Sequence, residues 1–152
     1  MPLDPRTPVL IGAGQVTHRA ASVDDGREPV ALMCDAIERA ATDAGLAGVP
    51  DPDAIRVVSL LSWRYRDPAY FVAERLGLSP NETGHMNDGG NSPQTLVNIS
   101  AGEIQRGALD LAILAGGEAW RTRMRARAAH AELPWPIVPE EVAPQRVLGR
   151  GL

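Results

Sequence analysis

Apolar residues follow two patterns along the chain up to about residue 118. Short runs of consecutive apolar residues predict buried strands, because a strand covered on both faces needs no polar side. Longer stretches with apolar residues at helical spacing predict helices that bury one face. The runs predict strands at 8–16, 55–61 and 109–114, and the second pattern predicts helices at 28–44, 69–76 and 95–106.

Proline and glycine indicate where the first two helices begin and end. Pro29 falls in the first turn of the first helix, where its missing N–H costs no helical hydrogen bond. Gly45 and Gly77 follow the two helices, and glycine readily takes the left-handed conformation that ends a helix. These residues therefore support the helical assignment.

The stretch at 87–94, Asn-Asp-Gly-Gly-Asn-Ser-Pro-Gln, has the chemistry of a helix start. We expect the Ser92 hydroxyl to cap the helix and Pro93 to take its first position. Gly89 and Gly90 allow close approach to the backbone. Free N–H groups at this positive end of the helix would stabilise an oxyanion or a thioester carbonyl. Local sequence alone favours an ordinary capped helix after a glycine turn.

This stretch and the residues after it resemble the nucleophile-elbow region of the thiolase superfamily. An Asn-rich turn precedes the helix, which ends in Ile104-x-x-Gly107, and Asp110, an apolar run and Gly-Gly-Glu at 116–118 follow. In that family the turn carries the reactive cysteine, and alignment from Ile104 places it at Gly90. The turn is most similar to that of thiolase-like and sterol-carrier-type acetyl-CoA acetyltransferase-like proteins. The resemblance covers most of residues 7–125.

The resemblance implies a layered α/β half-fold in which helices cover a mixed sheet, with a further strand at 82–87. It also implies an acyl-CoA-handling protein without Cys-dependent thiolysis, because the nucleophile position is glycine. A coenzyme A thioester would be the substrate, and no cofactor would be bound permanently. The implied ligand-binding residues are Asn87, Gly89, Gly90, Asn91, Arg121 and Arg123. Ser92 and His85 are the remaining catalytic candidates, although capping explains Ser92 and a lone histidine is more often structural.

An alternative to catalysis is a binding or assembly subunit that keeps the thiolase shape, or a truncated relative that needs a partner. The second half of the duplicated fold, which supplies a histidine and a second cysteine in the family, is absent from this sequence. Without it, Leu96 and Ile99 would leave part of an apolar helix face exposed. We therefore expect a homo-oligomer or a complementary thiolase-like chain.

The composition changes after Glu118, so we divide the chain into a domain at 1–118 and a second region at 119–152. Arginines at 121, 123, 125 and 127 would lie around most of a helix, or on one side of a strand. They indicate either a solvated excursion or a contact with an anion such as the CoA phosphates. Four prolines between 134 and 144 exclude a long helix or a central strand and predict an irregular arm.

The sequence does not support a dinucleotide-binding site, a reactive cysteine or a metal site. Gly12-x-Gly14 lacks the third glycine of a dinucleotide site, because Thr17 stands in its place. Cys34 lies inside a predicted helix with no histidine near it in sequence, which is typical of a small buried hydrophobe. No cluster of histidine, cysteine and acidic residues has the spacing of a metal site, so we predict no metal.

Composition limits the remaining function classes. The chain has 152 residues, 44% of them apolar, which suits one domain with a core. Its net charge of −4 gives no support to nucleic-acid binding. A single cysteine excludes an internal disulfide and fits a reducing compartment. No apolar run reaches membrane-spanning length and no signal peptide is visible, so we expect a cytoplasmic protein without membrane contact.

Overall fold

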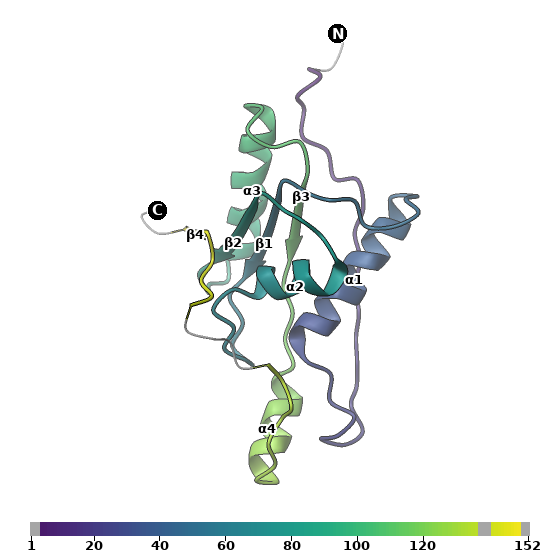
Figure 1. Ribbon diagram of the computed structural model, residues 1–152, viewed down its shortest axis with the longest axis vertical. Coiled ribbons are helices and arrows are strands. Elements are labelled where there is room, and N and C mark those ends of the chain that lie inside the picture. The colour runs from purple at the N-terminus through teal and green to yellow at the C-terminus, as the bar shows by residue number, and fades with distance from the viewer. Residues whose placement is uncertain (1–3, 137–140, 150–152) are drawn as a thin grey trace.

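The structure, a computed structural model, describes residues 4–136 and 141–149 and contains four helices and four strands in that part of the chain (Figure 1). The elements are α1 (Pro29–Asp43), β1 (Ala54–Val58), α2 (Pro68–Leu76), β2 (Glu82–Met86), α3 (Ser92–Gln105), β3 (Ala112–Ala115), α4 (Trp120–Ala128) and β4 (Arg146–Leu148). The predicted helices at 28–44, 69–76 and 95–106 are therefore confirmed, with shifts of up to three residues at their ends. No helix among the described residues has the length and apolar character to cross a membrane.

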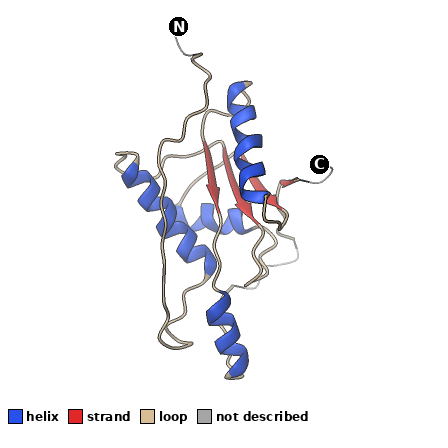
Figure 2. Ribbon diagram, turned by 180° about the vertical axis from the view of Figure 1, so that it is seen from behind, coloured by secondary structure: helices blue, strands red, loops and turns tan. Residues whose placement is uncertain are grey.

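The strands form one sheet in the order β3-β1-β2-β4, with helices on both faces. Figure 2 shows α3 in front of the sheet, with α1 and α2 behind it. The predicted layered α/β fold is confirmed. The sheet that we expected to be mixed is parallel at all three of its strand pairings. Parallel pairing follows from the connections, because each of β1, β2 and β3 is separated from the next strand by a crossover helix.

The main core lies between the sheet and the helices α1 and α2. Ile55 and Val57 of β1 point into it and are fully buried, together with Met33 of α1 and Val72 of α2. Alternate residues of the same strand point to the other face, where Val58 packs near α3. Both faces of β1 are covered, which explains its unbroken apolar run. The strand ends at Val58, three residues before the predicted end.

The face under α3 has a smaller core, and here one expectation is wrong. Leu96, which we expected to be exposed, is only 2% exposed because it packs against Met86 and Leu148. Leu148 belongs to β4, so the region that we predicted as an irregular arm supplies a short strand at the sheet edge and covers α3. The neighbouring Val97 is the exposed residue, at 48%.

The predicted buried strand at 8–16 is also wrong. This segment contains no strand, and Val9 and Leu10 are 71% and 86% exposed. It runs extended beside β3 and packs through its glycines on α1 instead. A Cβ atom on Gly12 would lie 2.2 Å from the carbonyl oxygen of Ala40, and one on Gly14 would lie 2.0 Å from that of Ala36. The glycines thus permit backbone-to-helix contact, as expected of a close approach, but the neighbour is a helix.

The region after Glu118 begins with α4, which projects from the end of the sheet (Figure 1). The helical alternative for the arginine stretch is therefore correct. Part of the predicted arm, at 137–140 and 150–152, lies outside the described residues. The domain boundary at residue 118 stays a prediction.

Candidate functional site

A cavity of about 430 Å³ lies at the carboxyl ends of β1 and β3, beside the first turns of α3. Ligands of parallel α/β sheets commonly bind at this end of the strands. The lining is mostly apolar, with a carboxylate, Glu118, among the lining side chains. The lining residues are Val58, Ser59, Pro93, Leu96, Val97, Leu114, Ala115, Gly116, Gly117 and Glu118.

The two loops that border this cavity are tied together by hydrogen bonds around Glu118. Its carboxylate accepts the N–H groups of Leu61 and Ser62, at 2.6 and 2.8 Å. In return, the Ser62 hydroxyl accepts the N–H of Ala119 at 2.9 Å. Sequence analysis picked out residues 116–118 through the family resemblance. It missed Ser62, which is fully buried and has no distinguishing spacing in the sequence.

The start of α3 differs from the predicted cap. Ser92 is the first helical residue, and Asn91 occupies the cap position without a side-chain hydrogen bond to the helix. The turn is closed by backbone groups, since the Ser92 N–H donates to the Gly89 carbonyl and the Thr95 N–H to the Asn91 carbonyl. The predicted capping role of the Ser92 hydroxyl is therefore wrong.

The predicted ligand-binding turn is exposed and lies just outside the cavity. Asn87, Gly89, Gly90 and Asn91 are all exposed, and none of them lines the cavity. A Cβ atom added to Gly90 would meet no atom within 4 Å. The structure thus brings residues 116–118 and the first turns of α3 together and leaves the preceding turn open to ligands or partners.

His85 does not join this site. It pairs in register with Val57, whose side chain enters the core under α1 and α2, so His85 lies on the face of the sheet opposite α3. Burial lowers the pKa of its imidazole, and the Asp67 carboxylate acts in the opposite direction. The structure therefore separates the two catalytic candidates, His85 and Ser92.

Cys34 also lies away from the cavity, in the core between α1, α2 and the sheet. Burial raises the pKa of its thiol to about 11, so the thiol stays protonated at neutral pH. The interpretation of Cys34 as a small buried hydrophobe agrees with this environment.

The two arginines predicted to bind anions differ in their surroundings. The Arg123 guanidinium donates to the carbonyls of Leu61 and Ser62 and lies over the Trp120 ring at 5.7 Å. It therefore holds α4 against the loop after β1. Arg121 is exposed and makes no hydrogen bond or ion pair with the described residues, so only Arg121 of this pair is available to a ligand.

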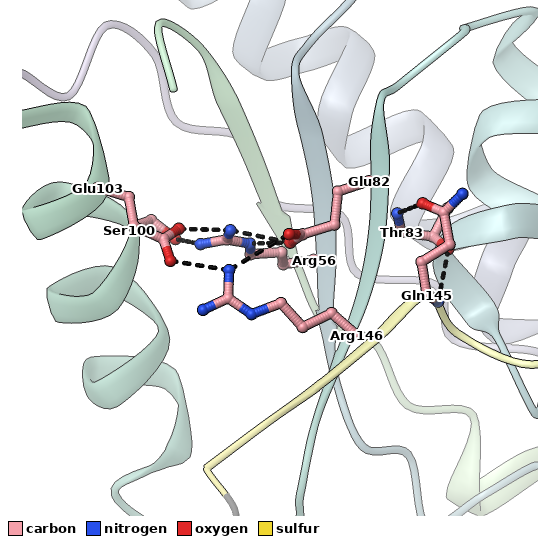
Figure 3. A network of polar contacts seen from close by, with 7 residues as sticks. All are labelled: Arg56, Glu82, Thr83, Ser100, Glu103, Gln145 and Arg146. Carbon is pink, nitrogen blue, oxygen red and sulfur yellow. Dashed lines mark hydrogen bonds and ion pairs between the residues drawn. The ribbon is translucent and has the colours of Figure 1, made fainter. Parts of the chain in front are cut away.

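Sequence analysis missed a buried ion-pair network between α3 and the sheet (Figure 3). The Arg56 side chain is fully buried and donates to Glu103, Ser100 and Glu82, at 2.5, 2.9 and 2.9 Å. Arg146 of β4 pairs with the same two glutamates, at 2.8 Å to Glu103 and 3.3 Å to Glu82. A lone arginine within an apolar strand was the signal available in the sequence. The network fixes α3 and β4 on the sheet and thereby positions the wall of the cavity.

The described residues contain no group of three or more histidine, cysteine, aspartate or glutamate side chains placed to hold a metal ion. In comparisons with known proteins, no family model matches the chain, and no curated protein matches it.

Proposed function

We propose that this protein binds an acyl thioester of the coenzyme A type, with the acyl group in the cavity between α3 and the carboxyl ends of β1 and β3. The observation that carries the proposal is the apolar lining of this cavity next to the first turn of a helix. Val58, Leu96 and Leu114 suit an aliphatic group. The positive end of the α3 dipole, at the first turn of the helix, favours the polarised carbonyl oxygen of the thioester.

Binding proceeds without a covalent acyl-enzyme. A covalent step needs an activated nucleophile beside the bound carbonyl. Gly90 offers none, and Cys34 is buried in the opposite layer with a raised pKa. Within the described residues, the Ser92 hydroxyl makes no hydrogen bond to a histidine or a carboxylate, and His85 lies on the other face of the sheet. The protein therefore holds the thioester for transfer by another component, as expected of a thiolase-like chain without its nucleophile.

Calorimetric titration with acetyl-CoA, and with coenzyme A alone, tests this proposal. Gly116 lines the cavity, and a Cβ atom there meets only Val58, at 3.9 Å, so Gly116→Leu fills the space without a backbone clash. We expect the variant to bind acetyl-CoA at least about tenfold more weakly, a loss of about 1.4 kcal/mol. Gly48→Leu is the matched control, because a Cβ atom on Gly48 meets no atom within 4 Å.

Three results contradict the proposal. The first is no binding of acetyl-CoA by the wild type at millimolar concentration. The second is equal binding by Gly116→Leu and Gly48→Leu, which would place the ligand elsewhere. The third is a stable mass increase after incubation with acetyl-CoA, which would show that a covalent acyl-enzyme forms.

A further inference from the structure

The outer edge of β3 is free in the described part of the structure. Among the described strands, β3 lies at one end of the sheet and pairs only with β1. Within the described residues, no backbone hydrogen bond joins its outer side to the neighbouring segment at 8–14. A strand edge with unpaired N–H and C=O groups readily accepts another strand.

An apolar groove of about 530 Å³ separates this edge from the segment at 8–14, with α1 and α3 as its other walls. No charged side chain lines it. Ten large apolar side chains are exposed in the described part of the chain, and five of them line this groove: Val9, Leu10, Ile11, Leu46 and Val97. Half of the exposed large apolar residues in the described part of the chain thus gather around the unpaired edge of one strand.

Residues 8–11, which we call the strap, cross the mouth of this groove and are held on both sides. Before the strap, the Arg6 guanidinium donates to the carbonyls of Ile104 and Leu109 and pairs with Asp110, just before β3 begins. After it, the Ala13 N–H donates to Asp43 of α1. The strap itself makes no hydrogen bond with the described residues.

The strap also runs in the same direction as β3. Arg6 lies beside the start of β3, and the chain after the strap continues toward α4, where a Cβ atom on Gly26 would lie 2.1 Å from Thr122. Figures 1 and 2 show the segment passing along the free edge of β3 from one end to the other. A strand formed by the strap would therefore be parallel to β3, like every other pairing in this sheet.

We propose that the strap closes onto β3 as a fifth, parallel strand of the sheet. Its four residues match the four residues of β3. Valine and isoleucine favour strands, and Pro8 stands at the first position, where proline is tolerated. Closure pairs the free edge of β3 and buries Val9, Leu10 and Ile11, while the anchors at Arg6 and Ala13 stay in place.

Closure has a consequence for the candidate site. The groove and the site cavity share four lining residues, Val97, Leu114, Ala115 and Gly116. With the strap open, the two spaces adjoin and can take a longer apolar group. With the strap closed, only the space between α3 and the strand ends is left. The strap is thus a gate on the size of the cavity, whichever ligand the cavity takes.

Amide hydrogen exchange of the full chain, followed by NMR, tests the strap. We expect the β3 amides on the outer edge to exchange at least about tenfold more slowly in the wild type than in Leu10→Asp, because the aspartate cannot enter an uncharged groove. Val147→Asp is the matched control, since it adds the same charge at the opposite edge of the sheet, at a side chain that is 39% exposed. In Val147→Asp, the outer β3 amides should exchange at the wild-type rate.

Three results overturn the inference. In the first, the outer β3 amides of the wild type exchange as fast as those of an unstructured peptide. In the second, they exchange slowly in the wild type and in Leu10→Asp alike. In the third, protection rises with protein concentration, which would assign the edge to a second copy of the chain. Melting curves of both variants verify that each is folded during the measurement.

Discussion

Removal of the Glu103 charge should destabilise the fold more than any surface ion pair does. In Glu103→Gln, the side chain keeps its length but loses its charge, and the fully buried Arg56 loses its partner at 2.5 Å. Arg146 loses the same partner, so two cations then share Glu82 alone. Glu82 is 23% exposed, and it remains within 2.8 Å of Arg56, so the buried charge keeps part of its compensation.

The expected loss of unfolding free energy depends on how deeply each charge is buried. Loss of one partner from a buried pair costs about 3–5 kcal/mol, because an uncompensated charge is left in a medium of low polarity. Since Glu82 remains, we expect the lower end, about 3 kcal/mol. Arg56→Met/Glu103→Gln removes both charges and leaves the Arg146–Glu82 pair, so it should cost less than the sum of Arg56→Met and Glu103→Gln. The coupling energy between the two positions should be about 2 kcal/mol.

Urea unfolding of the wild type, the two single variants and the double variant measures this coupling. Asp35→Asn is the surface control, because the Arg27–Asp35 pair is 37% and 35% exposed and should contribute at most about 1 kcal/mol. Two outcomes would refute the reasoning: a loss in Glu103→Gln no larger than in Asp35→Asn, or a double variant whose loss equals the sum of the singles.

Three shorter predictions concern other carboxylates and the thiol. Burial acts to raise the pKa of Glu103, but hydrogen bonds from Arg56 and Arg146 outweigh it and hold the pKa below its ordinary 4.5. The unfolded chain then binds more protons, so stability should fall as the pH drops below about 4.5, and the slope measured by acid titration should be smaller in Glu103→Gln. Asp53→Asn should cost about 1–3 kcal/mol in urea unfolding, because this carboxylate accepts the N–H groups of Asp110 and Leu111 at 2.7 and 3.0 Å. Iodoacetamide should alkylate Cys34 at pH 7.5 more slowly than a free cysteine peptide, since burial raises the thiol pKa to about 11, and equal rates would contradict that environment.

Helix positions could be predicted from the sequence because their signals are local. Pro29, Gly45 and Gly77 act through their own backbone conformations, and α1 and α2 begin and end within one or two residues of the positions that they indicate. Gly77 adopts the left-handed conformation, with φ of 66°, as its role at a helix end requires.

Strand pairing could not be predicted in the same way, because it depends on neighbours far along the chain. Residues 8–11 and β3 are both short apolar runs, yet only β3 pairs with β1 in this structure. The difference lies in Gly12 and Gly14, which bring the first segment onto α1 and away from the sheet. The exposure of Leu96 was misjudged for a related reason, since the strand that covers it, β4, comes from a proline-rich region with little strand signal.

The candidate site likewise contains residues that could be identified from the sequence and residues that could not. Residues 116–118 were identified through the family resemblance, and they line one cavity with the first turns of α3, while the predicted ligand-binding turn at 87–91 lies outside it. Ser62 and Arg56 were missed because their roles arise from partners 57 and 47 residues away, Ala119 and Glu103. No spacing within a single segment records such contacts.

Gly90 offers a direct test of the resemblance that motivated the proposed function. If the turn before α3 is built like a thiolase elbow, a cysteine at Gly90 should lie at the positive end of the helix, which favours the thiolate. A cysteine fits at this position, because Gly90 has no positive φ and a Cβ atom there meets nothing within 4 Å. Gly90→Cys should therefore fold with unchanged stability and react with iodoacetamide at neutral pH a few times faster than Gly48→Cys, whose position is equally open but stands in a loop. Peptide mapping separates the new cysteine from Cys34. Equal rates at positions 90 and 48 would mean that the helix end does not act on this residue, and the alignment of Gly90 with the family's cysteine would lose its physical basis.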